Sequence, residues 1–249
     1  MDVWMQSDSD SLGIENFILK EILSKSTCIL MHSFHEVSTP DMVDLKIPRE
    51  ALVVGDLNFM GLYFKLYHGI KQINPIEIPD YIRTKEFLLR DYEIYKPIEL
   101  EDLTGTYFVK DASKLKSFAG VVDFDRQTKD WISKEAIYIV SDVVDILSEY
   151  RCYVIGGELQ NCVNYNGDPY VLPDMSKIRK AIGLVNTHEK HLKSYTIDVM
   201  VTPKGTALIE IHDFMAVGLY GTLWGGNLVY AYRDGMDYIL DSNENRLLK

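Results

Sequence analysis

Two acidic residues occupy the two arms of a β-hairpin predicted over residues 195–211. Ile, Val, Thr and Tyr dominate both arms, and Pro203-Lys204-Gly205 between them has the residue types of a turn. A three-residue loop with a left-handed Gly205 pairs Asp198 with Glu210. Like charges opposite each other in a sheet repel unless a cation separates them, and Mg2+ is the simplest hard cation for carboxylate oxygens. Two acids on the solvated face of an ordinary hairpin would need no ion, so the segment alone leaves both interpretations open.

Alternation along these strands assigns each side chain to a face of the hairpin. The predicted register pairs Thr202 with Thr206 and separates an acidic face from an apolar one. The acidic face carries Asp198, Met200, Leu208, Glu210 and His212, and the apolar face carries Ile197, Val199, Ile209 and Ile211. We expect the apolar face in the core and the acidic face at a site.

A lysine ends the strand predicted over residues 106–110. A lysine in this position either reaches the surface or points at an anion, because lysines are rarely buried without a partner. The following loop supplies Lys114, Lys116 and Gly120. Their cations and free backbone N–H groups suit phosphate oxygens, although such loops are also common on solvated surfaces. Lys110 and this loop are therefore candidates for an anion site.

A second hairpin is predicted around Gly156-Gly157. Alternation places Glu149 and Arg151 on one face of its first strand, where they form either an exposed salt bridge or part of a site. A two-residue turn sets Cys152 and Cys162 on opposite faces, so we expect both thiols to pack and not to bridge.

Composition restricts the class of protein. The chain has 249 residues, 47% hydrophobic and 25% charged, with a formal net charge of −11, as in globular proteins with one large domain or two that share a cleft. The negative charge argues against non-specific binding to nucleic acid. No apolar run reaches membrane-spanning length and the N-terminus lacks the basic start of a signal peptide, so the cytoplasm is the expected location.

Hydrophobic periodicity divides the chain near residue 80, where Pro75 and Pro79 interrupt it. The part before this point is predicted to form a small α/β unit. The expected elements are a helix over 12–25, strands over 27–31 and 51–54, a helix over 81–95, a strand over 136–140, and a helix from 175 to about 185 that Asp174 caps. The final stretch from residue 214 is expected to be rich in loops, with a short helix or strand near 228–232.

Four of these features occur in the order found in the ATP-grasp ligases. The family has a series of residues that bind the nucleotide and the metal. The features that resemble this series are Lys110 at the end of a strand, a hinge over 141–145 followed by Glu149, and then Asp198 and Glu210. Each match alone is weak, and the shared order makes the resemblance specific over residues 80–221.

Arg151 is similar to the arginine of the ATP-grasp clade named for an arginine and two lysines, which is related to the cell-division-cycle 123-like proteins. The resemblance implies an α+β ATP-grasp fold, in which two α+β subdomains clasp ATP, preceded by a small α/β N-terminal domain. The implied boundaries are 1–80 for the N-terminal domain and 81–249 for the ATP-grasp domain, with lobes of about 81–145 and 146–249.

The resemblance also implies a role for each candidate residue. Lys110 and Arg151 are expected to act in catalysis. The nucleotide-binding residues are expected to be Lys110, Lys116, Ser141, Val143, Glu149 and Leu208. The Mg2+ ligands are expected to be Asp198, Glu210 and His212. The family usually has Asn at the place of His212, and imidazole prefers softer metals than Mg2+, so Asp213 is an alternative third ligand.

The implied function is an ATP- and Mg2+-dependent ligation of a carboxylate to an amine through an acylphosphate, with an amino acid, peptide or protein as substrate. The alternative is an ATP-binding assembly factor or chaperone that makes no product, and a kinase on the same scaffold is a third hypothesis. The expected partners are ATP, a carboxylate substrate and an amine acceptor, without a membrane or nucleic acid.

Overall fold

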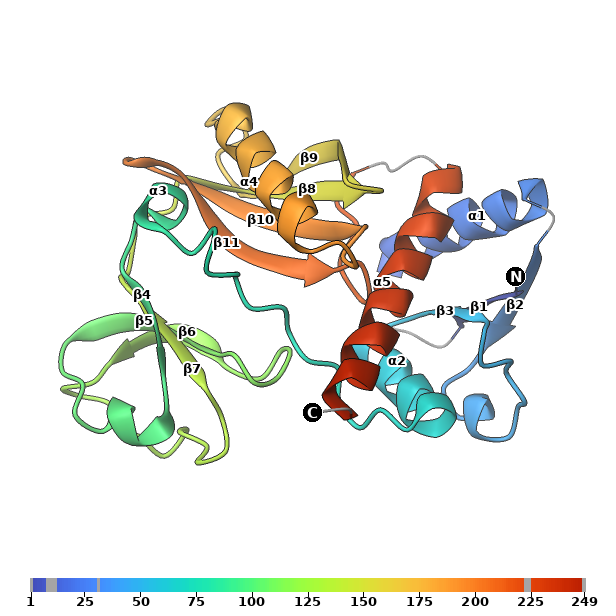
Figure 1. Ribbon diagram of the computed structural model, residues 1–249, viewed down its shortest axis with the longest axis horizontal. Helices are drawn as coiled ribbons and strands as arrows, with labels where there is room; N and C mark the ends of the chain where they lie inside the picture. The colour runs from blue at the N-terminus through green and yellow to red at the C-terminus, as the bar shows by residue number, and fades with distance from the viewer. Residues whose placement is uncertain (1, 8–12, 31, 222–224, 248–249) are drawn as a thin grey trace.

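The computed structural model describes residues 2–7, 13–30, 32–221 and 225–247. Each of three β-sheets is formed by a separate stretch of the described chain, and in Figure 1 the first sheet lies on the right and the other two on the left, with helices packed against them. None of the helices in these ranges is both long and apolar enough to cross a membrane.

The N-terminal unit is built on a parallel sheet of β1 (Asp2–Gln6), β2 (Ser33–Val37) and β3 (Leu52–Val54), in the order β2-β1-β3. The helix α1 (Gly13–Ile29) connects β1 to β2, and α2 (Leu57–Tyr63) follows β3 and continues as a π-helix over Phe64–His68. A 3-10 turn spans Asp41–Val43. This sheet bears out the predicted α/β unit and its strand near 51–54.

The C-terminal helix packs into the core of this unit. The C-terminal helix α5 (Gly225–Leu247) packs Leu228, Val229 and Tyr232 into the same core as Val3 and Leu23. In Figure 1 α5 stands between the N-terminal sheet and the rest of the protein. The N-terminal core therefore includes a helix that the sequence boundaries assign to the other domain.

Some sequence expectations for these elements are wrong. Residues 27–29 belong to α1 and form no strand, while Met31 lies outside the described residues. The strand β1 was not expected, because its sequence DVWMQ is short and its partners β2 and β3 lie far along the chain. The stretch from residue 225 to 247 is one long helix, where only a short element near 228–232 was expected among loops.

The second sheet is antiparallel and contains β4 (Tyr92–Tyr95), β5 (Thr106–Asp111), β6 (Ala119–Asp123) and β7 (Tyr138–Ser141), in the order β4-β7-β5-β6. Its core includes Val109, Val122 and Tyr138. The expected helix over 81–95 is wrong: α3 (Lys85–Leu88) is one turn that ends at the left-handed Leu89. The following residues pair with β7, so tertiary pairing overrides the local helix preference. A 3-10 turn covers Pro97–Leu100.

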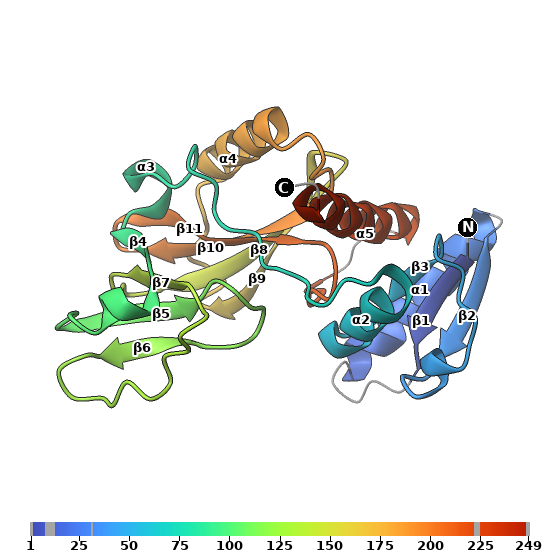
Figure 2. The same cartoon turned by 60° about the horizontal axis from the view of Figure 1, so that its bottom comes forward.

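The third sheet holds β8 (Ser148–Ile155), β9 (Glu158–Gly167), β10 (Tyr195–Thr202) and β11 (Gly205–Asp213), all antiparallel, in the order β11-β10-β8-β9. The helix α4 (Met175–His188) covers one face and buries Ile178, Ala181, Ile182 and Val185. Asp174 caps α4 as predicted, accepting hydrogen bonds from the N–H groups of Ser176 and Lys177. Figure 2 shows α4 and the second sheet on opposite sides of the third sheet.

The β10–β11 hairpin pairs Asp198 with Glu210, as predicted, but through a different register. Its turn has two residues, so Thr202 pairs with Gly205 and not with Thr206. A β-bulge between Asp198 and Val199 then restores the predicted acid pair. Between the bulge and the turn, the β11 side chains therefore lie on the face opposite to the predicted one, so that Leu208 pairs with Val199 on the apolar face.

The β8–β9 hairpin also contains a bulge, which contradicts the expectation for its cysteines. The register shifts between Tyr153 and Val154, so Cys152 pairs directly with Cys162. Their Sγ atoms lie 3.0 Å apart, and both are free thiols. The sequence offered no signal for this bulge, and the thiols therefore share a face that was predicted to hold only one of them.

Candidate functional site

The candidate site lies where the second sheet faces the third. Lys110, near the end of β5, forms an ion pair with Glu210 on β11, although the two residues are 100 positions apart in the chain. Both line two adjoining cavities, one of about 280 Å3 and one of about 440 Å3. We refer to these as the first and the second cavity. The Lys110–Glu210 pair marks the boundary between them.

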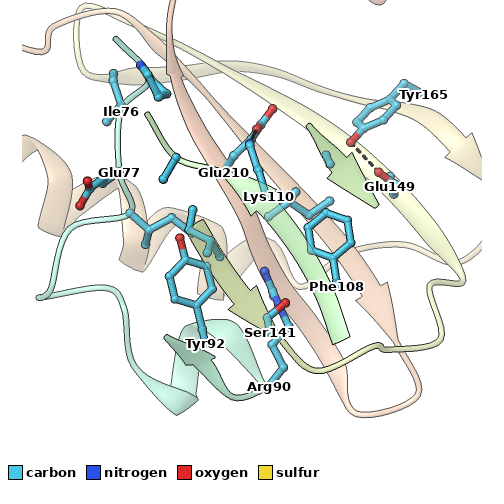
Figure 3. A pocket seen from close by; sticks show the side chains of 16 residues that line it. Ile76, Glu77, Arg90, Tyr92, Phe108, Lys110, Ser141, Glu149, Tyr165 and Glu210 are labelled. Atoms are coloured by element: carbon cyan, nitrogen blue, oxygen red, sulfur yellow. Dashed lines mark hydrogen bonds and ion pairs between the residues drawn. The ribbon is translucent and has the colours of Figure 1, made fainter. Parts of the chain in front are cut away.

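The first cavity is mainly apolar. Residues from both sheets and from the linker before α3 form its walls, including Ile76, Ile78, Tyr92, Phe108, Ile139 and Ile209 (Figure 3). Ser141 and Glu149 add polar groups. Two apolar walls with a few polar groups are typical of pockets that hold a planar organic ligand.

Glu149 has a fixed orientation in the first cavity. Its Oε2 accepts a hydrogen bond of 2.7 Å from the hydroxyl of Tyr165 (Figure 3). Its Oε1 accepts one of 2.7 Å from Nδ2 of Asn166. The carboxylate retains further acceptor capacity, since each of its oxygens has two lone pairs. It is therefore available to ligand hydroxyl groups.

Arg90 also lines the first cavity, and the sequence did not single it out. Its Nη1 donates hydrogen bonds to the carbonyls of Leu88, at 3.1 Å, and Leu208, at 2.8 Å. Burial lowers the pKa of Arg90 below its ordinary value, against the opposing effect of Tyr92 and Asp142. An arginine just before a short strand carries no recognisable signal by itself.

The second cavity is rich in cations. Lys110, Lys114, Lys116 and Arg151 line it, together with Glu210 and His212. Lys116 has a positive φ of 52°, a conformation that costs a non-glycine residue energy and often occurs at functional sites. The opposite wall comes from the N-terminal unit and α5, through Leu19, Val54, Asp56 and Tyr232. The cavity thus combines a side rich in cations with a mainly apolar side that carries the Asp56 carboxylate.

Asp198 is almost completely buried and pairs with Arg151. The Nε and Nη2 atoms of Arg151 lie 2.8 and 2.7 Å from the two carboxylate oxygens, which is a bidentate arrangement. Burial raises the pKa of Asp198, and Arg151 opposes that shift. For Glu210 the balance is reversed: burial would raise its pKa, but the charge and hydrogen bond of Lys110 lower it below the ordinary value.

The carboxylates of Asp198 and Glu210 fit Mg2+ as oxygen donors, because this ion is commonly held by one or two carboxylates and completed by waters and phosphates. Each of them has a protein cation as its partner in this structure. In the described part of the chain, no three His, Cys, Asp or Glu side chains converge as a metal site. The Lys110 ammonium contacts Oε2 of Glu210, so the other carboxylate oxygen of Glu210 has no ion-pair partner among the described residues.

His212 and Asp213 differ as candidates for a third ligand. His212 lines the second cavity, with its Nδ1 2.5 Å from the carbonyl oxygen of Asp213. The Asp213 carboxylate is buried and accepts a hydrogen bond of 3.0 Å from the N–H of Met215, and burial raises its pKa. Asp213 thus stabilises the following loop and lines neither cavity.

The structure brings most of the predicted site residues together. Those that line a cavity are Lys110, Lys116, Ser141, Glu149, Arg151, Glu210 and His212, and Asp198 lies behind Arg151. Val143 lies in the loop after β7 with its side chain half exposed, and lines neither cavity. The placement predicted for Leu208 is wrong: the bulge turns it into the core beside Val199, and Ile209 takes the position in the first cavity.

Comparison with known proteins gives a family and a fold. Residues 87–224, more than half of the chain, match a family model of the ATP-grasp domain, described as family 2 of the clade named for an arginine and two lysines. No curated protein sequence matches the chain.

Solved structures of low sequence identity share the fold. The D-alanine–D-alanine ligase from Bacillus anthracis has a TM-score of 0.55 at 13% identity, over 99% of this chain and 98% of that one. D-cycloserine synthetase DcsG has a TM-score of 0.54 at 11% identity, over 96% and 99%. The macrocyclase MdnC from Microcystis aeruginosa, bound with precursor peptide MdnA, has a TM-score of 0.50 at 15% identity, over 97% and 100%. Because the family model matches more than half of the chain, the chain belongs to the ATP-grasp family, in the clade named for an arginine and two lysines.

Proposed function

We propose that the protein is an ATP- and Mg2+-dependent ligase that joins a carboxylate to an amine through an acylphosphate. One observation carries this proposal: the Lys110–Glu210 pair lies between a mainly apolar cavity, which suits a nucleotide base, and a cavity lined by cations. A nucleoside triphosphate has the same polarity along its length, with an aromatic base at one end and anionic phosphates at the other. ATP and Mg2+ are the cofactors of ATP-grasp ligases.

The residues of the first cavity would orient the nucleoside. Phe108, Ile139 and Ile209 would pack on the base, and the backbone at Ser141 would meet its polar edge. Glu149, held by Tyr165, would accept hydrogen bonds from ribose hydroxyls. This orientation directs the phosphates past Lys110 into the second cavity.

The residues of the second cavity would stabilise charge on the transferred phosphoryl group. Lys110 and Arg151 are the catalytic cations, and Lys116 adds a further positive charge from the loop. Asp198 and Glu210, with His212 as the third candidate, would hold Mg2+, which supplies charge neutralisation at the phosphate oxygens. Positioning and electrostatics suffice for this chemistry, so no protein general base is required.

The reaction proceeds in two balanced steps. An oxygen of the substrate carboxylate attacks the γ-phosphorus of ATP, an O–P bond forms, and ADP leaves. The amine nitrogen then attacks the carbonyl carbon of the acylphosphate, a C–N bond forms, and inorganic phosphate leaves with a proton released from the amine. An amino acid, a peptide or a protein would satisfy this chemistry as substrate.

The Glu210→Gln substitution tests the proposal. It removes a negative charge that Mg2+ requires, and we expect the Mg2+-dependent turnover of ATP to fall on the order of a hundredfold or more. Glu158→Gln is the matched control, because Glu158 is exposed at the start of β9 and lines neither cavity. Unchanged turnover in a folded Glu210→Gln variant would reject the assignment.

A second candidate function is an ATP-binding assembly factor that makes no product. The observation that favours it is that both carboxylates are neutralised by protein cations, while His212 replaces the usual Asn and points its Nδ1 at a backbone oxygen. Incubation with ATP, Mg2+ and mixed amino acids separates the two functions. Phosphate release that depends on an acceptor supports the ligase, and stoichiometric ATP binding without release supports the factor.

A further inference from the structure

Tyr165 on β9 contacts groups that belong to both cavities. Its hydroxyl donates the 2.7 Å hydrogen bond to Glu149 in the first cavity. Its ring stacks on the ring of Tyr220, with centroids 5.1 Å apart and an angle of 17° between the planes. Tyr220 lines the second cavity, so the two rings span the divide between them.

Arg151 lies against the same pair of rings. Its guanidinium carbon is 5.7 Å from the centroid of Tyr165 and 5.1 Å from that of Tyr220. Such contacts attract a cation to the ring faces and restrict its orientation. The guanidinium that holds Asp198 is therefore bounded on one side by aromatic rings and on the other by a carboxylate.

The loop that carries Tyr220, residues 216–221, is fixed to β8 by the same group of side chains. The carbonyl oxygen of Gly218 accepts hydrogen bonds from Nη1 of Arg151, at 3.0 Å, and from the hydroxyl of Tyr153, at 3.1 Å. The N–H of Tyr220 donates to the Tyr153 hydroxyl at 2.6 Å. Movement of the Tyr220 ring would thus disturb the loop and the arginine together.

The Tyr165 hydroxyl is a permanent donor. Burial raises its pKa most, and the negative charges of Asp198 and Glu149 raise it further. The phenol therefore keeps its proton at neutral pH and donates a hydrogen bond to the Glu149 carboxylate.

We propose that Tyr165 is a positioning residue that sets Glu149 in the first cavity and Arg151 in the second, and so aligns the sugar end with the phosphate end of one bound nucleotide. This inference rests on the proposed function for the identity of the ligand. The hydroxyl performs the first task and the ring performs the second, which makes the two tasks separable by substitution.

Two variants and one control test the proposal. Tyr165→Phe removes the hydroxyl and keeps the ring, while Tyr165→Leu removes both. Tyr170→Phe is the control, because Tyr170 is 91% exposed in the loop after β9 and lines neither cavity. Circular dichroism first establishes that each variant is folded.

The first measurement compares the affinities for ATP and 2′-deoxy-ATP by calorimetry with Mg2+. We expect the preference of the wild type for ATP to fall about tenfold in Tyr165→Phe, since a misoriented Glu149 loses one hydrogen bond to the sugar. We also expect Tyr165→Phe to raise the KM for ATP more than it lowers kcat, and Tyr165→Leu to lower kcat further through Arg151.

The second measurement needs no nucleotide. Hydrogen exchange of residues 216–221 should be faster in Tyr165→Leu than in the wild type, and slow in Tyr165→Phe, because the ring of Tyr165 contacts Tyr220 of the loop whereas its hydroxyl contacts Glu149. If Tyr165→Leu does not fold, Tyr220→Leu removes the same stack from the other side.

The outcomes separate this inference from the proposed function. A wild type that binds no ATP rejects the proposed function, while hydrogen exchange still decides whether the ring fixes the loop. An ATP preference that is equal in the wild type and Tyr165→Phe overturns the role of the hydroxyl. Exchange that is unchanged in Tyr165→Leu, or equally fast in both variants, overturns the role of the ring.

Discussion

Arg151→Met isolates the buried charge of Asp198. The side chains of Arg151 and Asp198 are only 11% and 4% exposed, so the substitution leaves a carboxylate without its counter-ion inside the protein. Removing one partner of a buried ion pair typically costs about 3–5 kcal/mol of unfolding free energy. The lost hydrogen bond to the Gly218 carbonyl adds about 1 kcal/mol.

Protonation of Asp198 sets a limit on the electrostatic part of this cost. For an Asp with an unfolded-state pKa of about 3.9, the free-energy cost of protonation is about 4 kcal/mol at pH 7 and about 1.5 kcal/mol at pH 5. Burial already raises the pKa of Asp198 in the folded wild type, and removal of Arg151 raises it further. The native state then binds the proton more readily than the unfolded state, so stability falls as pH rises between the two pKa values.

Urea unfolding followed by circular dichroism at pH 5 and pH 7 measures the effect. We expect the deficit of Arg151→Met relative to the wild type to be about 2–3 kcal/mol larger at pH 7 than at pH 5. The double variant Arg151→Met/Asp198→Asn removes the buried charge, and we expect it to regain most of this difference at pH 7. A deficit that is independent of pH, or a double variant that is no more stable than the single one, would refute the reasoning.

Three further predictions concern the β-hairpins. Leu208→Ala should cost about 2–5 kcal/mol of stability in urea unfolding, whereas Ile209→Ala should chiefly weaken ATP binding in calorimetry; the reverse pattern would contradict the bulged register. Oxidised glutathione should convert Cys152 and Cys162 into a disulfide, with two reduced glutathione molecules released and two hydrogen atoms lost from the chain. Peptide mass spectrometry detects this change, and persistence of both thiols would contradict their contact. Gly167→Ala should lower the unfolding free energy by about 2 kcal/mol or more, because Gly167 has a φ of +74° and a Cβ would lie 2.4 Å from the carbonyl oxygen of Leu147. Equal stability of the variant and the wild type in thermal unfolding would contradict this expectation.

Local patterns in the sequence predicted the strands that hold the site. The alternation around Asp198 and Glu210, the apolar run before Lys110 and the Asp174 cap each depend on neighbouring residues, and the structure has all of them. The order of these features along the chain also indicated the family that the comparison confirms. Such signals are readable because strand alternation and capping act over a few residues.

Within the two hairpins, errors arose where a single residue changed the register. The bulge between Asp198 and Val199 changes the faces of the β11 side chains on the side of the turn, and the bulge beside Tyr153 brings Cys152 opposite Cys162. The acid pair was predicted correctly because the shorter turn and the bulge compensate each other. The position of a bulge depends on packing against the rest of the protein, and the hairpin sequence does not encode it alone.

The amino-acid sequence by itself determined the strands that carry the acidic and basic residues of the site, and the family. Only the tertiary structure decided which charges meet: Lys110 with Glu210 across two sheets, and Arg151 with Asp198 between neighbouring strands. It also decided that Tyr165 joins Glu149 to Arg151 and that α5 packs into the N-terminal core. The physical reason is range, since these contacts form only when sheets from distant parts of the chain pack together, and local residue patterns carry no information about that packing.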